Sequence, residues 1–176
     1  MRVILNSEKI AQAVEQLCQR IVADTPADRD IAVIGIRSRG EVLGQRLCEK
    51  LSQKLGTEIL SGTLDITLYR DDLHSPHSVA QPTVRTTEIG FNIDEKIIIL
   101  ADDVLYTGRS ARAAMDALID LGRPRAIRLA VLVERTGREF PIQADYVGYK
   151  TDVGEDERVQ VNFVESDGKD KVTVEP

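Results

Sequence analysis

Apolar residues recur at helical spacing in three parts of the chain, and each recurrence predicts a helix with one buried face. The first helix begins after Asn6 and Ser7, which can cap its first turn. The third, at residues 111–120, ends before Gly122 and Pro124. The buried positions of the first two helices are predicted to be Ile10, Val14, Leu17, Cys18, Ile21, Val42, Leu43, Leu47, Leu51 and Leu55.

Between these helices lie apolar runs with no polar alternation, which predict strands buried on both faces. A further stretch, residues 61–69, alternates apolar and polar positions and predicts another strand. Strands that alternate with helices indicate an α/β fold, with a mostly parallel central sheet flanked by helices. The uninterrupted runs are residues 31–36, 96–101 and 126–133.

Two segments have weaker patterns. Residues 70–87 are polar and without apolar periodicity, and a loop of this length in a compact domain usually has a function. Residues 134–164 are expected to be irregular, with one late strand at residues 159–164. No repeat or long linker divides the chain, so residues 1–176 are expected to form a single domain.

Composition narrows the function classes. The chain has 176 residues, a formal net charge of −6 and no Trp, so its core is aliphatic and its surface is not broadly basic. We therefore expect neither a membrane-binding surface nor a constitutive, broadly basic surface for nucleic acid. No apolar run is long enough for a membrane span or a signal sequence, so we expect a cytoplasmic protein.

The cysteines and histidines do not predict a disulfide, a reactive thiol or a metal site. Cys18 and Cys48 fall on apolar helix faces, where reduced thiols act as small hydrophobic groups. His74 and His77 lie in the polar loop without further ligands nearby in the sequence, so we expect no metal there.

The strand at residues 96–101 leads into an acid pair, Asp102 and Asp103, and then into a short turn and a helix. Ligands of open α/β sheets bind at the carboxyl ends of the strands. Thr107, Gly108 and Ser110 bring small side chains and free backbone amides to a helix N-terminus, which suits a phosphate. Adjacent carboxylates suit sugar hydroxyls and a hard divalent cation.

A solvated strand end and the acid pocket of a receiver domain account for this motif less well. Either would place two carboxylates after a strand, but neither would have a phosphate loop directly behind them. The glycine patterns of Walker and dinucleotide-binding loops are absent from the sequence.

Residues 102–110 resemble the phosphoribosyl-diphosphate (PRPP) signature of type I phosphoribosyltransferases. Together with residues 64–73, they are similar to the PyrR family, and the resemblance extends over about residues 4–149. It implies the type I fold, with a core of about residues 1–133 and a small hood of about residues 134–165. Residues 166–176 are expected to form a C-terminal tail that is loose from residue 169 onward, as chain termini commonly are. The resemblance also implies Mg²⁺ and a homodimer or higher homo-oligomer.

The family further implies uracil phosphoribosyltransferase activity, which forms UMP and diphosphate from uracil and PRPP. Asp102 and Asp103 would bind the ribose hydroxyls and, indirectly through PRPP or water, the metal. Residues expected to take the 5-phosphate are Val104, Leu105, Tyr106, Thr107, Gly108, Arg109 and Ser110.

The leaving diphosphate needs positive charge where negative charge develops. Ser38, Arg39 and Gly40 match the short pyrophosphate loop of the family and follow a strand end that can face the same crevice. Arg70 and Arg85 lie in the segment 70–87, a candidate lid, and could add charge to the diphosphate or could be ordinary surface arginines. The hood segment from Arg138 to Val147 is expected to select the base.

The second activity implied by the family is UMP-dependent binding to pyrimidine-operon leader RNA. RNA-binding members have Arg-Gly-His-Arg-Glu-Leu-Pro-Ile-Arg in the hood, whereas this chain has Gly137 and Gln143 in place of the histidine and the last arginine. Arg135, Arg138 and Lys150 remain as candidate RNA contacts. With fewer cations we expect weak RNA affinity and a shallow salt dependence.

The first helix points the same way, because it offers Glu15, Gln16 and Gln19 where RNA-binding members offer basic and hydroxyl groups. Two alternatives to the uracil transferase stay open. One is an RNA-binding regulator with vestigial activity. The other is a phosphoribosyltransferase for another base, such as hypoxanthine or orotate.

Overall fold

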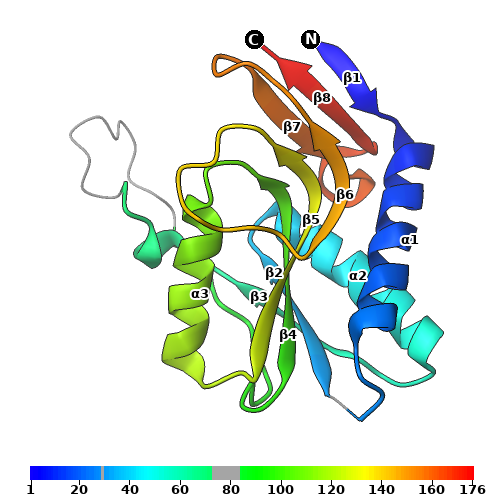
Figure 1. Ribbon diagram of the computed structural model, residues 1–176, viewed down its shortest axis with the longest axis vertical. Helices are drawn as coiled ribbons and strands as arrows, with labels where there is room; N and C mark the ends of the chain where they lie inside the picture. The colour runs from blue at the N-terminus through cyan, green and yellow to red at the C-terminus, as the bar shows by residue number, and fades with distance from the viewer. Residues whose placement is uncertain (29, 73–83) are drawn as a thin grey trace.

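The structure is a computed structural model that describes residues 1–28, 30–72 and 84–176. Its centre is a five-stranded parallel sheet in the order β3-β2-β4-β5-β6 (Figure 1). Parallel neighbours bring all their carboxyl ends to the same edge, which lies at the top of Figure 1. The strands are β2 (Ile31–Ile36), β3 (Leu60–Leu64), β4 (Ile97–Leu105), β5 (Ala126–Arg135) and β6 (Tyr146–Thr151).

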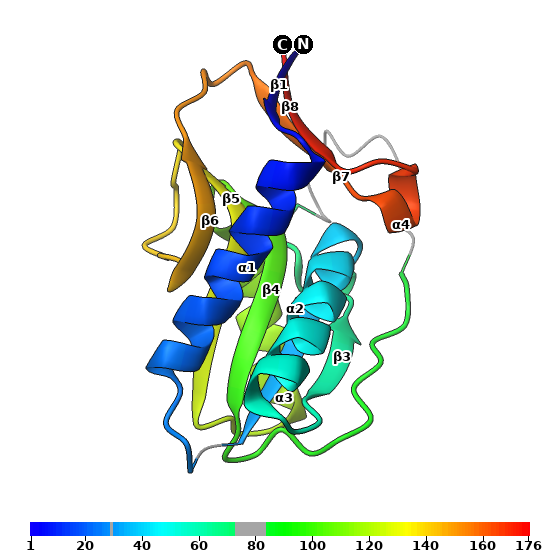
Figure 2. The same cartoon turned by 90° about the vertical axis from the view of Figure 1, so that its right-hand side faces the viewer.

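Helices cover both faces of this sheet. Helices α1 (Ser7–Asp24) and α2 (Arg39–Leu55) lie side by side on one face, and α3 (Arg109–Leu121) lies on the other (Figures 1 and 2). The apolar residues on each side form separate core clusters, because the sheet stands between them. The prediction of an α/β fold is confirmed.

The first helix follows its predicted pattern. Asn6 is the N-cap of α1 and its side chain accepts the Lys9 N–H at 3.0 Å. All five predicted apolar positions of α1 are buried. In α2 the prediction fails at Leu55, which is 38% exposed in the last turn, next to Gly56 in the left-handed conformation.

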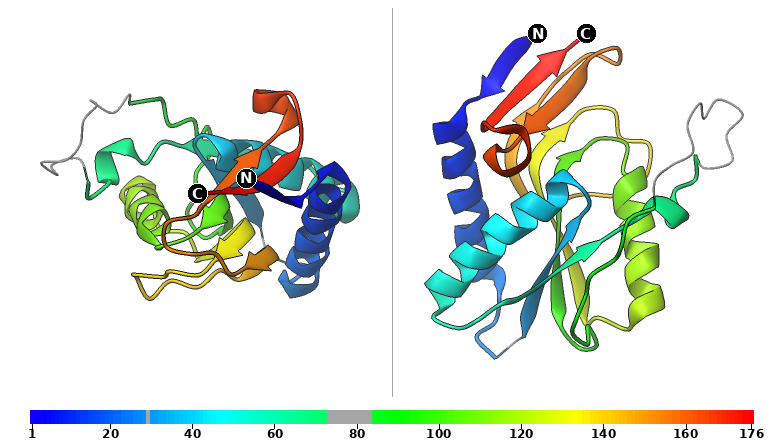
Figure 3. Two further views of the ribbon diagram at one scale, coloured as in Figure 1. Left: turned by 90° about the horizontal axis from the view of Figure 1, so that it is seen from above. Right: turned by 180° about the vertical axis from the view of Figure 1, so that it is seen from behind.

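A second, antiparallel sheet stands over the carboxyl ends of the main strands (Figures 1 and 3). It consists of β1 (Arg2–Leu5), β8 (Lys171–Glu175) and β7 (Arg158–Asn162), in the order β1-β8-β7, and we call it the small sheet. The helix α4 (Val164–Asp167) connects β7 to β8.

The prediction that residues 169–176 form a loose tail was therefore wrong. β8 is the central strand of the small sheet, and Val172 and Val174 are 0% and 2% exposed. Its two partners are β1, from the other end of the chain, and β7. A five-residue strand whose partner is so distant gives little local signal.

The hood predicted at residues 134–165 is also divided differently. β6 pairs with β5 and completes the main sheet, whereas β7 belongs to the small sheet. The strand predicted at residues 61–69 ends at Leu64, and a 3-10 helix follows at Thr67–Tyr69. Asp65 accounts for this change, because its carboxylate accepts the Thr67 N–H and hydroxyl and turns the chain.

The acid pair lies inside a strand and not after one. β4 extends to Leu105, four residues beyond the predicted end, and Asp102 stands opposite Val131 of β5. Helix α3 begins at Arg109, two residues earlier than predicted. The strand and helix are therefore separated only by Tyr106, Thr107 and Gly108.

Some expectations concern single residue types. Cys18 and Cys48 are free and buried, as predicted. Burial raises the pKa of the Cys18 thiol to about 11. His74 and His77 lie outside the described residues. Within the described chain, no helix combines the length and apolar character that crossing a membrane would require.

Candidate active site

The acid pair occupies the carboxyl end of β4. The Asp103 N–H donates to Asp102 Oδ1 at 3.0 Å, and both side chains are partly buried. Burial, reinforced by the neighbouring carboxylate, raises the pKa of Asp102 well above its ordinary value. Burial also raises the pKa of Asp103, although the charge of Arg39 acts in the opposite direction. Among the described residues, neither carboxylate forms an ion pair.

The loop between β2 and α2 meets this acid pair directly. A Cβ atom on Gly40 would lie 2.6 Å from the Ala101 carbonyl oxygen and 3.1 Å from Asp102 Oδ1. Only a glycine permits this approach, which explains the residue type. The peptide bond between Arg37 and Ser38 is cis. The structure thus brings Ser38, Arg39 and Gly40 to the end of β4, as predicted from the sequence order.

Arg39 is the first residue of α2 and faces the same end of the sheet. Its Nη2 donates to Asp167 Oδ1 at 3.0 Å, and its charge partly offsets the burial that raises the pKa of Asp103. Its Nε is buried, without a hydrogen-bond partner among the described residues. A buried donor of this kind is costly unless a ligand or water satisfies it. Arg39 is therefore suited to receive an anion.

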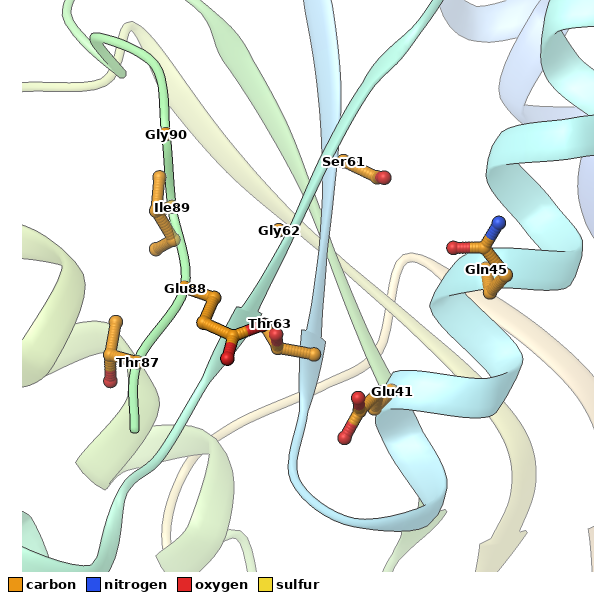
Figure 4. Close-up of a pocket in the computed structure, with 9 residues that line it drawn as sticks. All are labelled: Glu41, Gln45, Ser61, Gly62, Thr63, Thr87, Glu88, Ile89 and Gly90. Atoms are coloured by element: carbon orange, nitrogen blue, oxygen red, sulfur yellow. The ribbon is translucent and has the colours of Figure 1, made fainter. Parts of the chain in front are cut away.

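Arg37 points elsewhere. Its guanidinium lies within 3.5 Å of Glu41, Glu88 and Thr63. These three residues line a polar pocket of about 620 Å³ at the outer edge of β3, between α2 and residues 87–90 (Figure 4). The two arginines of the loop thus have different surroundings, and only Arg39 faces the acid pair.

The phosphate loop is held by backbone hydrogen bonds. The Thr107 carbonyl accepts the N–H groups of Glu139 and Phe140 at 3.0 and 2.9 Å. Gly108, the N-cap of α3, has φ of +93°, and a Cβ there would lie 3.2 Å from Phe140 Cβ. A glycine N-cap has no side chain to cap the helix; the Thr107 hydroxyl accepts the Arg109 N–H at 3.3 Å, and the following amides of the first turn are left for a ligand.

The larger side chains of residues 104–110 contact protein groups. Arg109 pairs with Glu139 at 2.7 Å and with Asp71, and stacks on Phe140 at 4.8 Å. Leu105 is buried in the core, and the Tyr106 ring lies 3.9 Å from the Arg135 guanidinium. Any 5-phosphate contact of these residues must come mainly from the backbone, with the hydroxyls of Thr107 and Ser110.

The two candidate base-binding residues lie in different places. Arg138 is beside the phosphate loop, since a Cβ on Gly108 would be 3.5 Å from its Cδ. Val147 is in β6 and stands opposite Val131 of β5, which in turn stands opposite Asp102 of β4. The Val147 side chain packs against the core cluster on the α3 side. Its role in base binding stays a prediction.

All three candidate RNA contacts line one pocket of about 230 Å³, but the protein already uses their charges. Glu134 accepts from Arg138 at 2.8 Å and pairs with Lys150 at 3.2 Å. Arg135 is only 5% exposed. It donates to the carbonyls of Thr136, Gly154 and Glu157. Arg135 is therefore a structural residue, and its assignment as an RNA contact is corrected.

The candidate lid is described only at its two ends, because residues 73–83 lie outside the described residues. Arg70 pairs with Asp72, and both side chains are at least half exposed. The Arg85 N–H donates to Asp65, whose other oxygen holds Thr67. Asp65 thus links Thr67, just before the segment, to Arg85 near its end. Among the described residues, no contact places the side chain of Arg70 or Arg85 at the acid pair.

Two features of this region were missed in the sequence. Asp167, the partner of Arg39, is 128 residues away from it in the chain and carries no motif. A pocket of about 350 Å³ beside Val104 and Tyr106 is bordered by Glu155, Asp156 and Glu157. The run of three acidic residues is visible in the sequence, but its position beside the phosphate loop depends on the pairing of β7 with β8 in the small sheet.

A metal would have to share its ligands with the substrate. No group of three or more His, Cys, Asp or Glu side chains suited to a metal occurs among the described residues. The acid pair offers carboxylate oxygens at a position where neither forms an ion pair within the described chain. Mg²⁺, which keeps several waters and binds through one or two carboxylates with substrate phosphates, fits such a site.

The fold and this arrangement of loops define a phosphoribosyltransferase of type I. Residues 2–167 match the family model described as phosphoribosyl transferase domain. The chain is similar to the hypoxanthine phosphoribosyltransferase of Trypanosoma cruzi, with a TM-score of 0.72 at 16% identity over 99% of this chain and 95% of that one. The Staphylococcus aureus enzyme gives 0.67 at 18%, covering 86% and 77%. At these identities the likeness concerns the fold.

Sequence relatives narrow the family. The chain is 48% identical to the bifunctional protein PyrR of Deinococcus radiodurans, over 96% of this chain and 91% of that protein. It is 46% identical to that of Bacillus cereus, over 98% and 96%. For Clostridioides difficile the identity is 42%, over 97% and 96%. The chain belongs to the PyrR family, as the resemblance of residues 64–73 and 102–109 predicted.

Proposed function

We propose that the protein transfers the ribosyl 5-phosphate of PRPP to uracil and releases diphosphate. The bond between the ribose C1 and diphosphate oxygen breaks, a bond to uracil N1 forms, and N1 loses its proton. The observation that carries the proposal is the meeting of Gly40 with Ala101 and Asp102. It joins a loop suited to diphosphate to an acid pair suited to the ribose hydroxyls.

Each part of the site has a separate task. Asp102 and Asp103 would accept hydrogen bonds from the 2- and 3-hydroxyls, and binding in this buried place is strong because water competes less. Arg39, with the amides of Ser38 and Gly40, would stabilise the charge that develops on the leaving diphosphate. The Thr107 and Ser110 hydroxyls and the first-turn amides of α3 would hold the 5-phosphate.

Mg²⁺ belongs to the proposal through PRPP. Asp102 and Asp103 would face it indirectly, through the ribose hydroxyls or water. When bound, it would neutralise diphosphate oxygens as the bond to C1 breaks. The raised pKa values of both carboxyl groups support this role, because a nearby cation would favour their charged forms.

The choice of uracil as the base is supported by membership of the family and not by a contact in the site. Arg138 lies beside the phosphate loop and is the residue best placed to approach a base, with Val147 as the second candidate. The test is a panel of uracil, orotate, hypoxanthine, guanine and adenine with PRPP and Mg²⁺. We expect turnover with uracil. Turnover restricted to a purine or to orotate would contradict the proposal and favour the transferase for another base.

The regulatory activity is the second part of the proposal. UMP-dependent binding to pyrimidine-operon leader RNA is supported by membership of a family whose members are named bifunctional. The pairing of Arg138 and Lys150 with Glu134 supports a weak affinity. A regulator with vestigial transferase activity would instead bind leader RNA tightly and turn over uracil very slowly.

Assembly and location complete the proposal. We expect a homodimer or a higher homo-oligomer, which sedimentation velocity can establish. A cytoplasmic location agrees with two buried cysteines that are free thiols, as expected in a reducing compartment.

A further inference from the structure

Asp167, at the end of α4, contacts the site from the small sheet. Its Oδ2 accepts the Phe163 N–H at 3.0 Å and the Ser166 hydroxyl at 2.8 Å, so its own turn fixes the carboxylate. Its Oδ1 remains for Arg39 Nη2 at 3.0 Å. Although burial acts in the opposite direction, these hydrogen bonds lower the pKa of Asp167 to about 2. The group is therefore ionised wherever the enzyme can be assayed.

The Arg39 side chain needs a partner to fix the direction of its guanidinium. Its backbone is fixed in the first turn of α2, but its side chain has several free torsions and is 31% exposed. Asp167 uses one of the five guanidinium donors, and the planar geometry then fixes the direction of the others. Nε, which has no partner among the described residues, is one of those donors.

We propose that Asp167 is a positioning residue for the reaction. It holds the Arg39 guanidinium in the orientation that receives diphosphate, and it does so across the contact between the small sheet and the pyrophosphate loop. This inference rests on the proposed function, specifically on Arg39 as a diphosphate ligand. Without Asp167, the side chain of Arg39 must be ordered when diphosphate binds, which weakens that binding roughly threefold to tenfold.

The chain provides a matched control. Glu165 lies on the same short helix and also pairs with an arginine of α2, but its partner is Arg46, at 2.6 Å. Arg46 also holds Asp170 and stacks on Phe163, away from the acid pair. Asp167→Asn and Glu165→Gln each remove one charge from α4, yet only the first concerns Arg39. The asparagine keeps an oxygen that can accept from Phe163.

The experiment measures the affinities of inorganic diphosphate, with Mg²⁺, and of UMP by titration calorimetry on the full chain. We expect Asp167→Asn to weaken diphosphate binding threefold to tenfold and to leave UMP binding within about twofold. Glu165→Gln should change neither affinity, although it can lower the melting temperature. Equal losses for both ligands in Asp167→Asn, or the same diphosphate loss in Glu165→Gln, would overturn the inference in favour of a purely structural role.

Arg39→Ala and the double variant with Asp167→Asn complete a thermodynamic cycle. If Asp167 acts through Arg39, its substitution has no further effect on diphosphate affinity once Arg39 is alanine. A full additional loss in the double variant would overturn the inference while leaving the diphosphate site intact. An unchanged diphosphate affinity in Arg39→Ala would instead remove the diphosphate assignment itself, and the positioning role with it.

Discussion

The charged side chains at the end of β4 and those around Glu134 differ in how far the protein itself neutralises them. Asp102 and Asp103 form no ion pair within the described chain, and Arg39 is held there through one bond from Nη2 to Asp167. Arg138 and Lys150 share Glu134, and Arg135 donates to three backbone carbonyls. The first region leaves its two carboxylates for a ligand, whereas the second uses most of its charges to hold the fold.

This contrast separates the two activities of the family in physical terms. Unpaired buried charges reduce stability, and functional sites commonly accept that cost. A phosphate backbone is bound by free surface cations through counterion release. We therefore expect transferase activity with weak RNA binding, and four substitutions test the comparison, two on each side.

The largest effect is expected for Asp102→Asn. Turnover with PRPP should fall roughly 10²- to 10³-fold, because charge-assisted hydrogen bonds to the ribose hydroxyls are weakened. Since the folded pKa of Asp102 is raised above its ordinary value of 3.8, its ionisation costs stability above about pH 4. The melting temperature of the variant should therefore rise at pH 7, and the gain should vanish as the pH falls below 3.8.

Calorimetric melting curves between pH 3 and pH 8 measure this gain, with PRPP turnover followed in parallel at pH 7. Asp103→Asn should behave in the same direction, because burial raises the pKa of that group too. A melting temperature that fell together with activity would show that the acid pair is needed for folding, contrary to the comparison.

Arg39→Ala should lower turnover about 10²-fold, the usual effect of losing one preorganised donor to a developing charge. UMP affinity should change little, because UMP has no diphosphate. Arg37→Ala is the control, since this arginine belongs to the same loop but contacts Glu41, Glu88 and Thr63. Steady-state kinetics and UMP titration distinguish the two variants. Equal effects of the two substitutions would mean that turnover depends on the total charge of the loop and not on the direction in which Arg39 points.

Arg135→Gln should lower the free energy of unfolding by about 2–3 kcal/mol, because three backbone carbonyls lose the charged donor of a buried side chain. Urea unfolding measures the loss. Lys150→Gln serves as the control, and its side chain is 73% exposed, so its stability should change by less than about 0.5 kcal/mol. An unchanged stability for Arg135→Gln, with reduced RNA binding, would restore Arg135 as an RNA contact.

The smallest expected effect is an increase. Glu134→Gln frees Arg138 and Lys150, so affinity for a leader RNA hairpin should rise roughly threefold to tenfold and its salt dependence should become steeper. Fluorescence titration at two salt concentrations, with and without UMP, measures both. Tight, UMP-enhanced binding by the unmodified protein, with a steep salt dependence, would show that other residues supply the RNA surface.

Much of the main sheet could be predicted because its strands and helices are neighbours in the sequence. Each run of residues 31–36, 96–101 and 126–133 carries its own pattern, and the parallel arrangement then places Gly40 and Asp102 at the same edge. Pairings between distant segments leave no such local pattern. For that reason the β1–β8 pair and the contact of Asp167 with Arg39 were not predicted.

Residue type also misled the prediction at Arg135. An arginine in a segment with few apolar residues normally lies at the surface, and its burial depends on the carbonyls of Gly154 and Glu157. Those carbonyls belong to the connection between β6 and β7, whose course is set by the small sheet. The sequence identifies the donor but not the distant acceptors.

The pairing of Arg2 with Val174 has a consequence for how the protein is made. Among the described residues, β1 has one strand partner, β8, so β1 leaves the ribosome long before the strand with which it pairs. Until β8 is synthesised, Val3 and Ile4 have no ladder to join, and the turn that carries Asp167 is not held from both sides. Nascent chains arrested before residue 170 should therefore have a folded main sheet but respond weakly to diphosphate.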